Sequence, residues 1–90
     1  MDRARASAIA QIERALRSTL DDITSRVRNG AGRSTVSELV RHARELAALL
    51  DQAVQRLDAD ADSESARRVA GDLVSHLRVL ERDLANRSLQ

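Results

Sequence analysis

Residues 36–57 read VSELVRHARELAALLDQAVQRL, and this stretch carries the clearest structural signal in the chain. Its apolar residues recur at alternating steps of four and three, the spacing that places side chains on one face of an α-helix. That face comprises Val36, Val40, Ala43, Ala47, Leu50, Val54 and Leu57. The alternation is a heptad repeat, so we expect coiled-coil-like packing against other helices.

A second apolar stripe lies beside the first on the same helix. It consists of Leu39, Leu46, Leu49 and Ala53, with His42 at its rim. Together the two stripes span roughly 180° of the helix, a wider arc than contact with one neighbour requires. We therefore expect these five residues to meet either a second helix of the chain or another molecule.

The residues before this stretch predict another helix, over residues 2–28. Its apolar positions, which are also three and four apart, are Ile9, Ile12, Leu16, Leu20, Ile23 and Val27. Asn29 and Gly30 then supply a left-handed helix stop. Thr35 and Glu38 match a capping box, in which both side chains bind free backbone N–H groups, so the next helix is predicted over residues 35–57.

The residues after the stretch predict a third helix, over residues 63–87. Its apolar positions are Ala66, Val69, Ala70, Leu73, Leu77, Leu80 and Leu84. Gly71 costs this helix about 1 kcal/mol relative to Ala, and close packing at that point would explain its presence. The prediction is one all-α domain over residues 1–90, a three-helix antiparallel bundle that runs up, down and up.

Composition excludes several kinds of chemistry. The 90 residues include fifteen Arg but no Lys, Cys, Pro or aromatic residue. Schiff bases, P-loop lysines and thiolate ligands are therefore absent. An Arg-only basic set is typical of a GC-rich genome, which favours a bacterial source. No apolar run is long enough to cross a membrane and no signal peptide is recognisable, so we expect a cytoplasmic protein.

The polar residues do not form a recognisable catalytic or metal site. The run from Asp58 through Asp60 to Asp62 opens like a calcium loop, but Ser63 and Val69 stand where that loop needs Gly and Glu. The two His residues have no local set of further ligands. We expect no enzyme activity, no cofactor, no metal and no small-molecule substrate.

Charge is unevenly distributed along the chain. Residues 1–33 carry seven Arg and four acidic residues, a net charge of +3, whereas residues 58–90 carry five Arg and seven acidic residues, a net charge of −2. The first and third helices of such a bundle are parallel. Their opposite charges favour pairing between them, within one chain or between chains.

Two functions follow as expectations. The first is a small interaction module, an adaptor, accessory or regulatory subunit, which binds another copy or a partner helix through Leu39, His42, Leu46, Leu49 and Ala53. The alternative is association with nucleic acid, because Arg side chains suit phosphate contacts. The Arg residues that would make these contacts are Arg3, Arg14, Arg17, Arg28, Arg67, Arg78 and Arg82.

Overall fold

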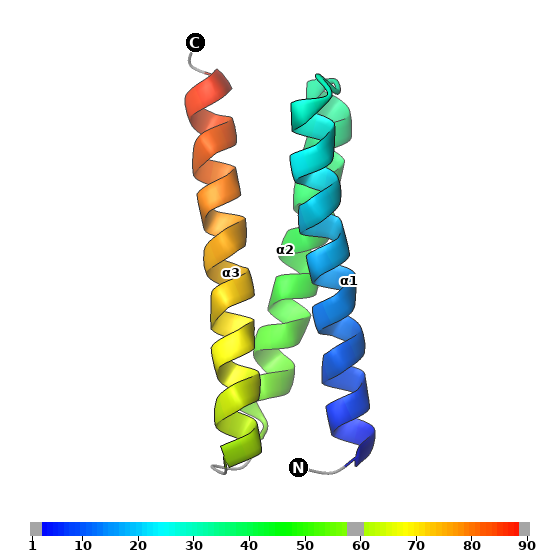
Figure 1. Cartoon of the computed structure of the whole chain (residues 1–90), viewed down its shortest axis with the longest axis vertical. Helices are drawn as coiled ribbons and strands as arrows, with labels where there is room; N and C mark the ends of the chain where they lie inside the picture. Colours follow the sequence, from blue (N-terminus) through cyan, green and yellow to red (C-terminus); the bar gives the residue numbers. More distant parts are fainter. Residues whose placement is uncertain (1–2, 58–60, 89–90) are drawn as a thin grey trace.

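The computed structural model describes residues 3–57 and 61–88, which form three α-helices. Helix α1 spans Arg3–Arg28, α2 spans Arg33–Gln55 and α3 spans Ala61–Ser88. The helices run up, down and up, so α1 and α3 are parallel (Figure 1). All three pairs of helices are in contact, most extensively α1 with α2 and least extensively α1 with α3. The predicted three-helix antiparallel bundle is confirmed.

The turn between α1 and α2 follows directly from its sequence. Gly30 has a positive φ of 75°, which is unfavourable for residues with a side chain. Its N–H donates to the Val27 carbonyl at 3.1 Å, and the Ala31 N–H donates to the Arg26 carbonyl at 2.9 Å. These two bonds form a Schellman motif. The predicted left-handed stop is confirmed, and it reverses the chain so that α2 returns along α1.

The predicted capping box at the start of α2 is wrong. The helix begins at Arg33, two residues earlier than expected, with Gly32 as an N-cap that makes no side-chain hydrogen bond. The Val36 N–H donates to the Gly32 carbonyl at 3.2 Å, so Thr35 already lies inside the first turn. An N-cap residue needs an extended backbone, and Gly32 has it with φ −64° and ψ 154°.

Three other helix boundaries also differ from the sequence prediction. Helix α2 ends at Gln55 instead of residue 57, and α3 spans Ala61–Ser88 instead of residues 63–87. Asp58 and Asp60 of the acidic connector, and the predicted first residue of α1, lie outside the described residues.

The core consists of aliphatic side chains from all three helices. Every heptad residue of α2 predicted to face inward is buried, together with Leu57 beyond its end. The other buried apolar residues are Ile9, Leu16, Leu20 and Ile23 of α1 and Ala66, Ala70, Leu73 and Leu77 of α3. Thr19 is also buried, and its hydroxyl donates to the Ala15 carbonyl at 2.8 Å, so its polar group is satisfied.

Gly71 is not explained by close packing. The residue is exposed, and a Cβ placed on it would meet no atom within 4 Å. The expectation of a tight approach at this position is therefore wrong, and nothing in the structure accounts for Gly71.

Candidate interaction surfaces

The first candidate surface is the α2 ridge, which we define as Leu39, His42, Leu46, Leu49 and Ala53. Three of its members, Leu39, Leu46 and Ala53, are partly buried and pack against the core. Leu49 is 52% exposed, while its neighbour Leu50 is completely buried. His42 is exposed. The chain thus covers most of the second apolar stripe but leaves Leu49 open to solvent.

The position of α3 explains why the ridge is incompletely covered. Arg44 of α2 forms an ion pair with Glu81 of α3, so the flank of α2 that carries Arg44 faces α3. At 100° per residue, Leu46 and Leu49 lie on the opposite flank of α2. Only α1 can cover that flank within the chain. One helix covers the inner part of the ridge and leaves the outer part exposed.

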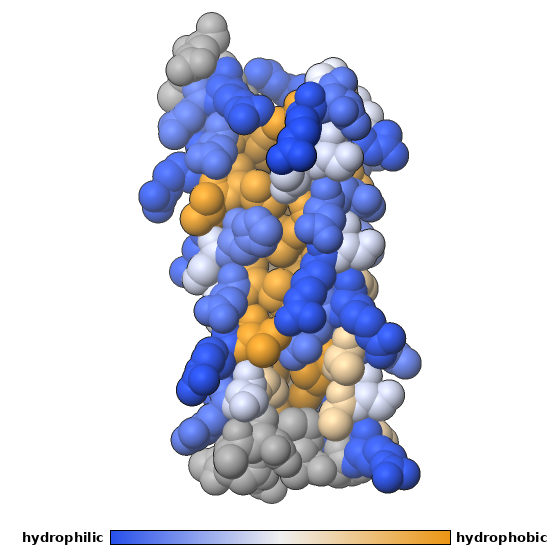
Figure 2. Space-filling model, viewed as in Figure 1, coloured by the Kyte–Doolittle hydropathy of each residue, from blue (hydrophilic) through white to orange (hydrophobic). Residues whose placement is uncertain are grey.

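The second candidate surface is the groove between α1 and α3. In the space-filling view an apolar stripe runs between these two helices along the molecule (Figure 2). Near the C-terminal end of α3 the groove deepens into a hollow of about 240 Å³. The hollow is lined by Ile23, Thr24, Val27 and Arg28 of α1 and by Leu80, Asp83, Leu84 and Arg87 of α3.

The groove was not predicted from the sequence. Val27, Leu80 and Leu84 carry the same helical spacing as core residues, and periodicity alone assigns them to the core. They pack against the core but are only partly buried, because α1 and α3 make the least extensive contact of the three pairs. Charge gives no signal for the groove either, because α3 (Ala61–Ser88) holds five Arg and five acidic residues and has no net charge opposite to that of α1.

A larger hollow of about 540 Å³ lies between α2 and α3 at the same end of the bundle. Val36, Val40 and Leu84 contribute apolar surface to it, and the Arg44–Glu81 ion pair stands among its lining residues. Val27 and Leu84 line both hollows, so the two together extend the apolar surface at this end of the molecule.

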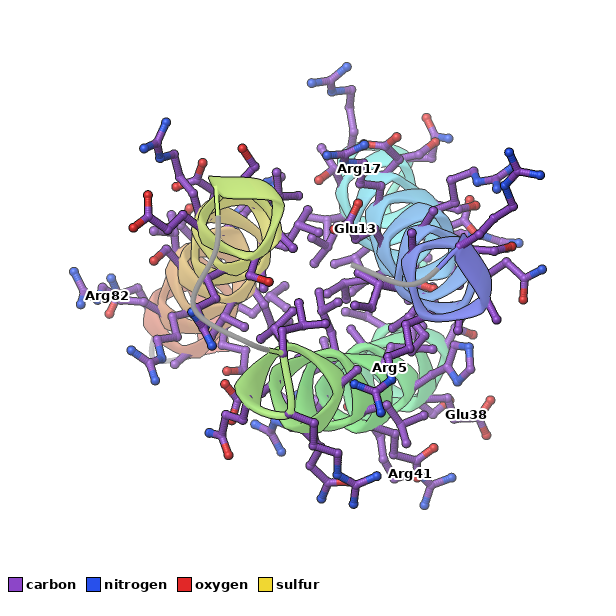
Figure 3. The ribbon with its side chains drawn as sticks, turned by 90° about the horizontal axis from the view of Figure 1, so that it is seen from below. Arg5, Glu13, Arg17, Glu38, Arg41 and Arg82 are labelled. Carbon is purple, nitrogen blue, oxygen red and sulfur yellow. The ribbon has the colours of Figure 1, made fainter. Side chains whose placement is uncertain are left out.

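The candidate phosphate-binding arginines do not form one surface. Arg3, Arg14, Arg17 and Arg28 of α1 are exposed, and Arg28 also lines the hollow between α1 and α3. Seen from the end of the bundle, Arg17 lies beside the opening between α1 and α3, whereas Arg82 points outward from α3 in another direction (Figure 3). Arg67 and Arg78 come together instead along a hollow between α2 and α3.

Arg67 has a structural contact that sequence reasoning missed. Its Nη2 donates to the Leu57 carbonyl at 2.8 Å, just beyond the end of α2. The bond gives a partner to a carbonyl of the connection that follows α2, and it fastens α3 to that connection. The contact between Arg67 and Leu57 depends on how the connection between α2 and α3 folds, so no local sequence pattern predicts it.

The described residues include no group of three or more His, Cys, Asp or Glu side chains placed to hold a metal ion. Within the same part of the chain, none of the helices has the length and hydropathy required to cross a bilayer. Comparison with protein-family models, with curated proteins and with solved structures finds no match for this chain.

Proposed function

We propose that this protein is a small non-enzymatic helical interaction module that docks the α2 ridge against a helix of another molecule, either a second copy or a partner for which it acts as an adaptor or accessory subunit. The observation that carries the proposal is that Leu49, a large apolar residue of the ridge, is 52% exposed to solvent. We also propose a cytoplasmic location, which is compatible with a fold that contains no cysteine and therefore needs no disulfide bond.

The spacing of the ridge supports docking against a helix. Leu39, Leu46 and Ala53 are separated by seven residues each, and His42 and Leu49 fill the intervening turns. Such a stripe fits the knobs-into-holes packing of a second helix laid along α2. Burying the exposed half of Leu49 would contribute roughly 1 kcal/mol, and the partly buried neighbours would add to it.

The proposal is tested by the mass of the purified chain in solution. Light scattering and sedimentation should give an oligomer for the wild type and a smaller species for Leu49→Arg, because the substitution places a charge in the centre of the apolar ridge. Peptide-bond absorbance gives the concentration, since the chain has no Trp or Tyr.

Ala48→Arg is the matched control for this experiment. It adds the same side chain to the same helix at an exposed position off the ridge, and it should keep the wild-type mass. Equal masses for the wild type and Leu49→Arg, or a wild-type monomer, would count against self-association through the ridge.

A second candidate function, nucleic-acid association, is supported by the exposed arginines of α1. Arg3, Arg14, Arg17 and Arg28 are exposed, and among the side chains that the structure describes, those of residues 3–57 and 63–87, the only ion pair within 4 Å is Arg44–Glu81. Duplex DNA should then bind at low salt, with an affinity that falls steeply as salt rises.

Mutation of α1 tests this second function. Arg14→Ala should weaken DNA binding and lower the salt slope by about 1, since one phosphate contact is lost. Arg41→Ala, which removes an exposed arginine from α2, should leave both unchanged. Absence of binding at low salt would exclude this function.

A further inference from the structure

We propose that the larger hollow between α2 and α3 docks an acidic segment of a partner protein, which inserts one bulky apolar side chain between these two helices. This α2–α3 hollow lies at the end of the bundle that holds the Gly30 turn and the C-terminal end of α3 (Figure 1). None of its lining residues belongs to the α2 ridge, so the inference does not rest on the proposed function of the ridge.

The floor of the α2–α3 hollow is apolar. It is formed by side chains of the three helices and of the Gly30 turn, namely Val27, Ala31, Val36, Val40 and Leu84. The volume of about 540 Å³ falls within the roughly 300–1,000 Å³ that is typical of binding pockets. A bulky apolar side chain that enters the hollow leaves water and gains dispersion contacts with this floor.

The rim of the hollow is positively charged. Arg33, Arg44 and Arg87 line it, against one acidic residue, Glu81. Glu81 pairs with Arg44, and this is the only ion pair within 4 Å among the side chains of residues 3–57 and 63–87. Within that part of the chain, Arg33 and Arg87 are therefore exposed cations without an acidic partner.

The neighbouring hollow between α1 and α3 does not cancel this charge. It shares Val27, Leu84 and Arg87 with the α2–α3 hollow and adds Arg28 and Asp83. The two hollows together hold four Arg and two acidic residues, a net charge of +2 beside apolar surface. Charge complementarity therefore favours a negatively charged occupant at this end of the bundle.

The residue types at the hollow favour carboxylates beside an apolar group. A guanidinium group binds a carboxylate through two parallel hydrogen bonds, and the methylene stem of Arg covers apolar surface beside it. The floor requires an apolar group as well, which a nucleic-acid backbone does not offer. Asp or Glu residues on either side of one bulky apolar residue meet both requirements.

The shape of the hollow favours a protein segment over a small molecule. Sites for small molecules enclose about 70–90% of the surface of the ligand. The α2–α3 hollow is open to solvent, and the three arginines on its rim are exposed. A segment that inserts one side chain and lays its backbone across the rim fits such an open site.

A fluorescent peptide tests the proposal. The probe is a short peptide with one Trp flanked by Leu and Glu residues. Because the chain has no Trp, the indole emission reports only the probe, and it shifts to shorter wavelength when the ring leaves water. The wild type should bind this Glu peptide, and a Lys peptide with Lys in place of every Glu should bind roughly 10-fold more weakly.

Charge reversal at the rim identifies the site. A variant with Arg33→Glu and Arg87→Glu should bind the Glu peptide roughly 10-fold more weakly and should prefer the Lys peptide, which also shows that the variant is folded. The matched control carries Arg41→Glu and Arg82→Glu, exposed positions of the same helices that do not line the hollow and point outward (Figure 3). At about 0.15 M salt, where distant charges are screened, the control should bind the Glu peptide as the wild type does.

Narrowing the hollow tests the apolar anchor without a change of charge. Ala31 lines the hollow, so Ala31→Leu should occupy part of its space and weaken the Glu peptide several-fold. Circular dichroism should show unchanged helix content. A variant that binds the peptide as tightly as the wild type would overturn the proposed anchor.

Three further results would overturn the proposal. The first is equal affinity for the Glu and Lys peptides, or an equal loss in the reversed variant and its control. The second is binding of decanoate as tightly as the Glu peptide, which would make the hollow a site for a small amphiphile. The third is loss of the peptide in Leu49→Arg, which would place the peptide on the α2 ridge. Unchanged binding in Leu49→Arg supports the hollow whether or not the ridge associates.

Discussion

At the scale of single residues, two glycines have opposite roles. Gly71 lies in the middle of α3, where it costs conformational entropy and makes no close contact that a Cβ would disturb. We expect Gly71→Ala to stabilise the fold by about 1 kcal/mol and to raise Tm by roughly 5 °C. Thermal unfolding followed by circular dichroism measures the change.

Gly30→Ala is the matched control for Gly71→Ala. A Cβ at Gly30 also meets nothing within 4 Å, but the φ of 75° is unfavourable for Ala. We expect Gly30→Ala to destabilise the protein by about 1 kcal/mol through backbone strain alone. A Gly71→Ala protein that unfolds at a lower temperature than the wild type would mean that α3 needs this glycine for a contact outside the single chain.

At the scale of the helix, two adjacent leucines of α2 differ sharply in burial. Leu50 is completely buried and Leu49 is 52% exposed. We expect Leu50→Ala to lower the free energy of unfolding by about 2–5 kcal/mol, since it opens a cavity among aliphatic side chains. Leu49→Ala should change that free energy by less than about 0.5 kcal/mol in dilute protein.

Urea unfolding at two protein concentrations checks both values. If the α2 ridge is covered in an oligomer, the cost of Leu49→Ala should increase with concentration, because association stabilises the folded state by mass action. A cost as large as that of Leu50→Ala in dilute monomer would contradict the exposed position of Leu49.

At the scale of the whole molecule, salt tests whether the α2 ridge associates through apolar contacts. Such an association should not weaken when ionic strength is raised to about 1 M, because salt screens charges and leaves apolar burial favourable. Sedimentation of the wild type at low and high salt measures the effect; an oligomer that dissociates as salt rises would contradict apolar docking.

The shape of the molecule accounts for its exposed surface. Its radius of gyration is 14.5 Å, whereas a compact domain of this length has roughly 12 Å. The core is built from Leu, Ile, Val and Ala without one aromatic ring, so three long helices enclose only a narrow column of buried side chains. A chain with this geometry gains stability when another molecule covers its sides.

The sequence by itself determined the three helices, the inward face of α2 and the turn at Gly30. These features are local, since they depend on helical spacing and on the backbone freedom of one residue. Only the tertiary structure decided that α3 packs on the Arg44 flank of α2, that Leu49 stays exposed, that Arg67 binds the Leu57 carbonyl, and that α1 and α3 leave a groove between them. These features depend on how far apart three packed helices lie, and contacts between residues distant in the chain set those separations.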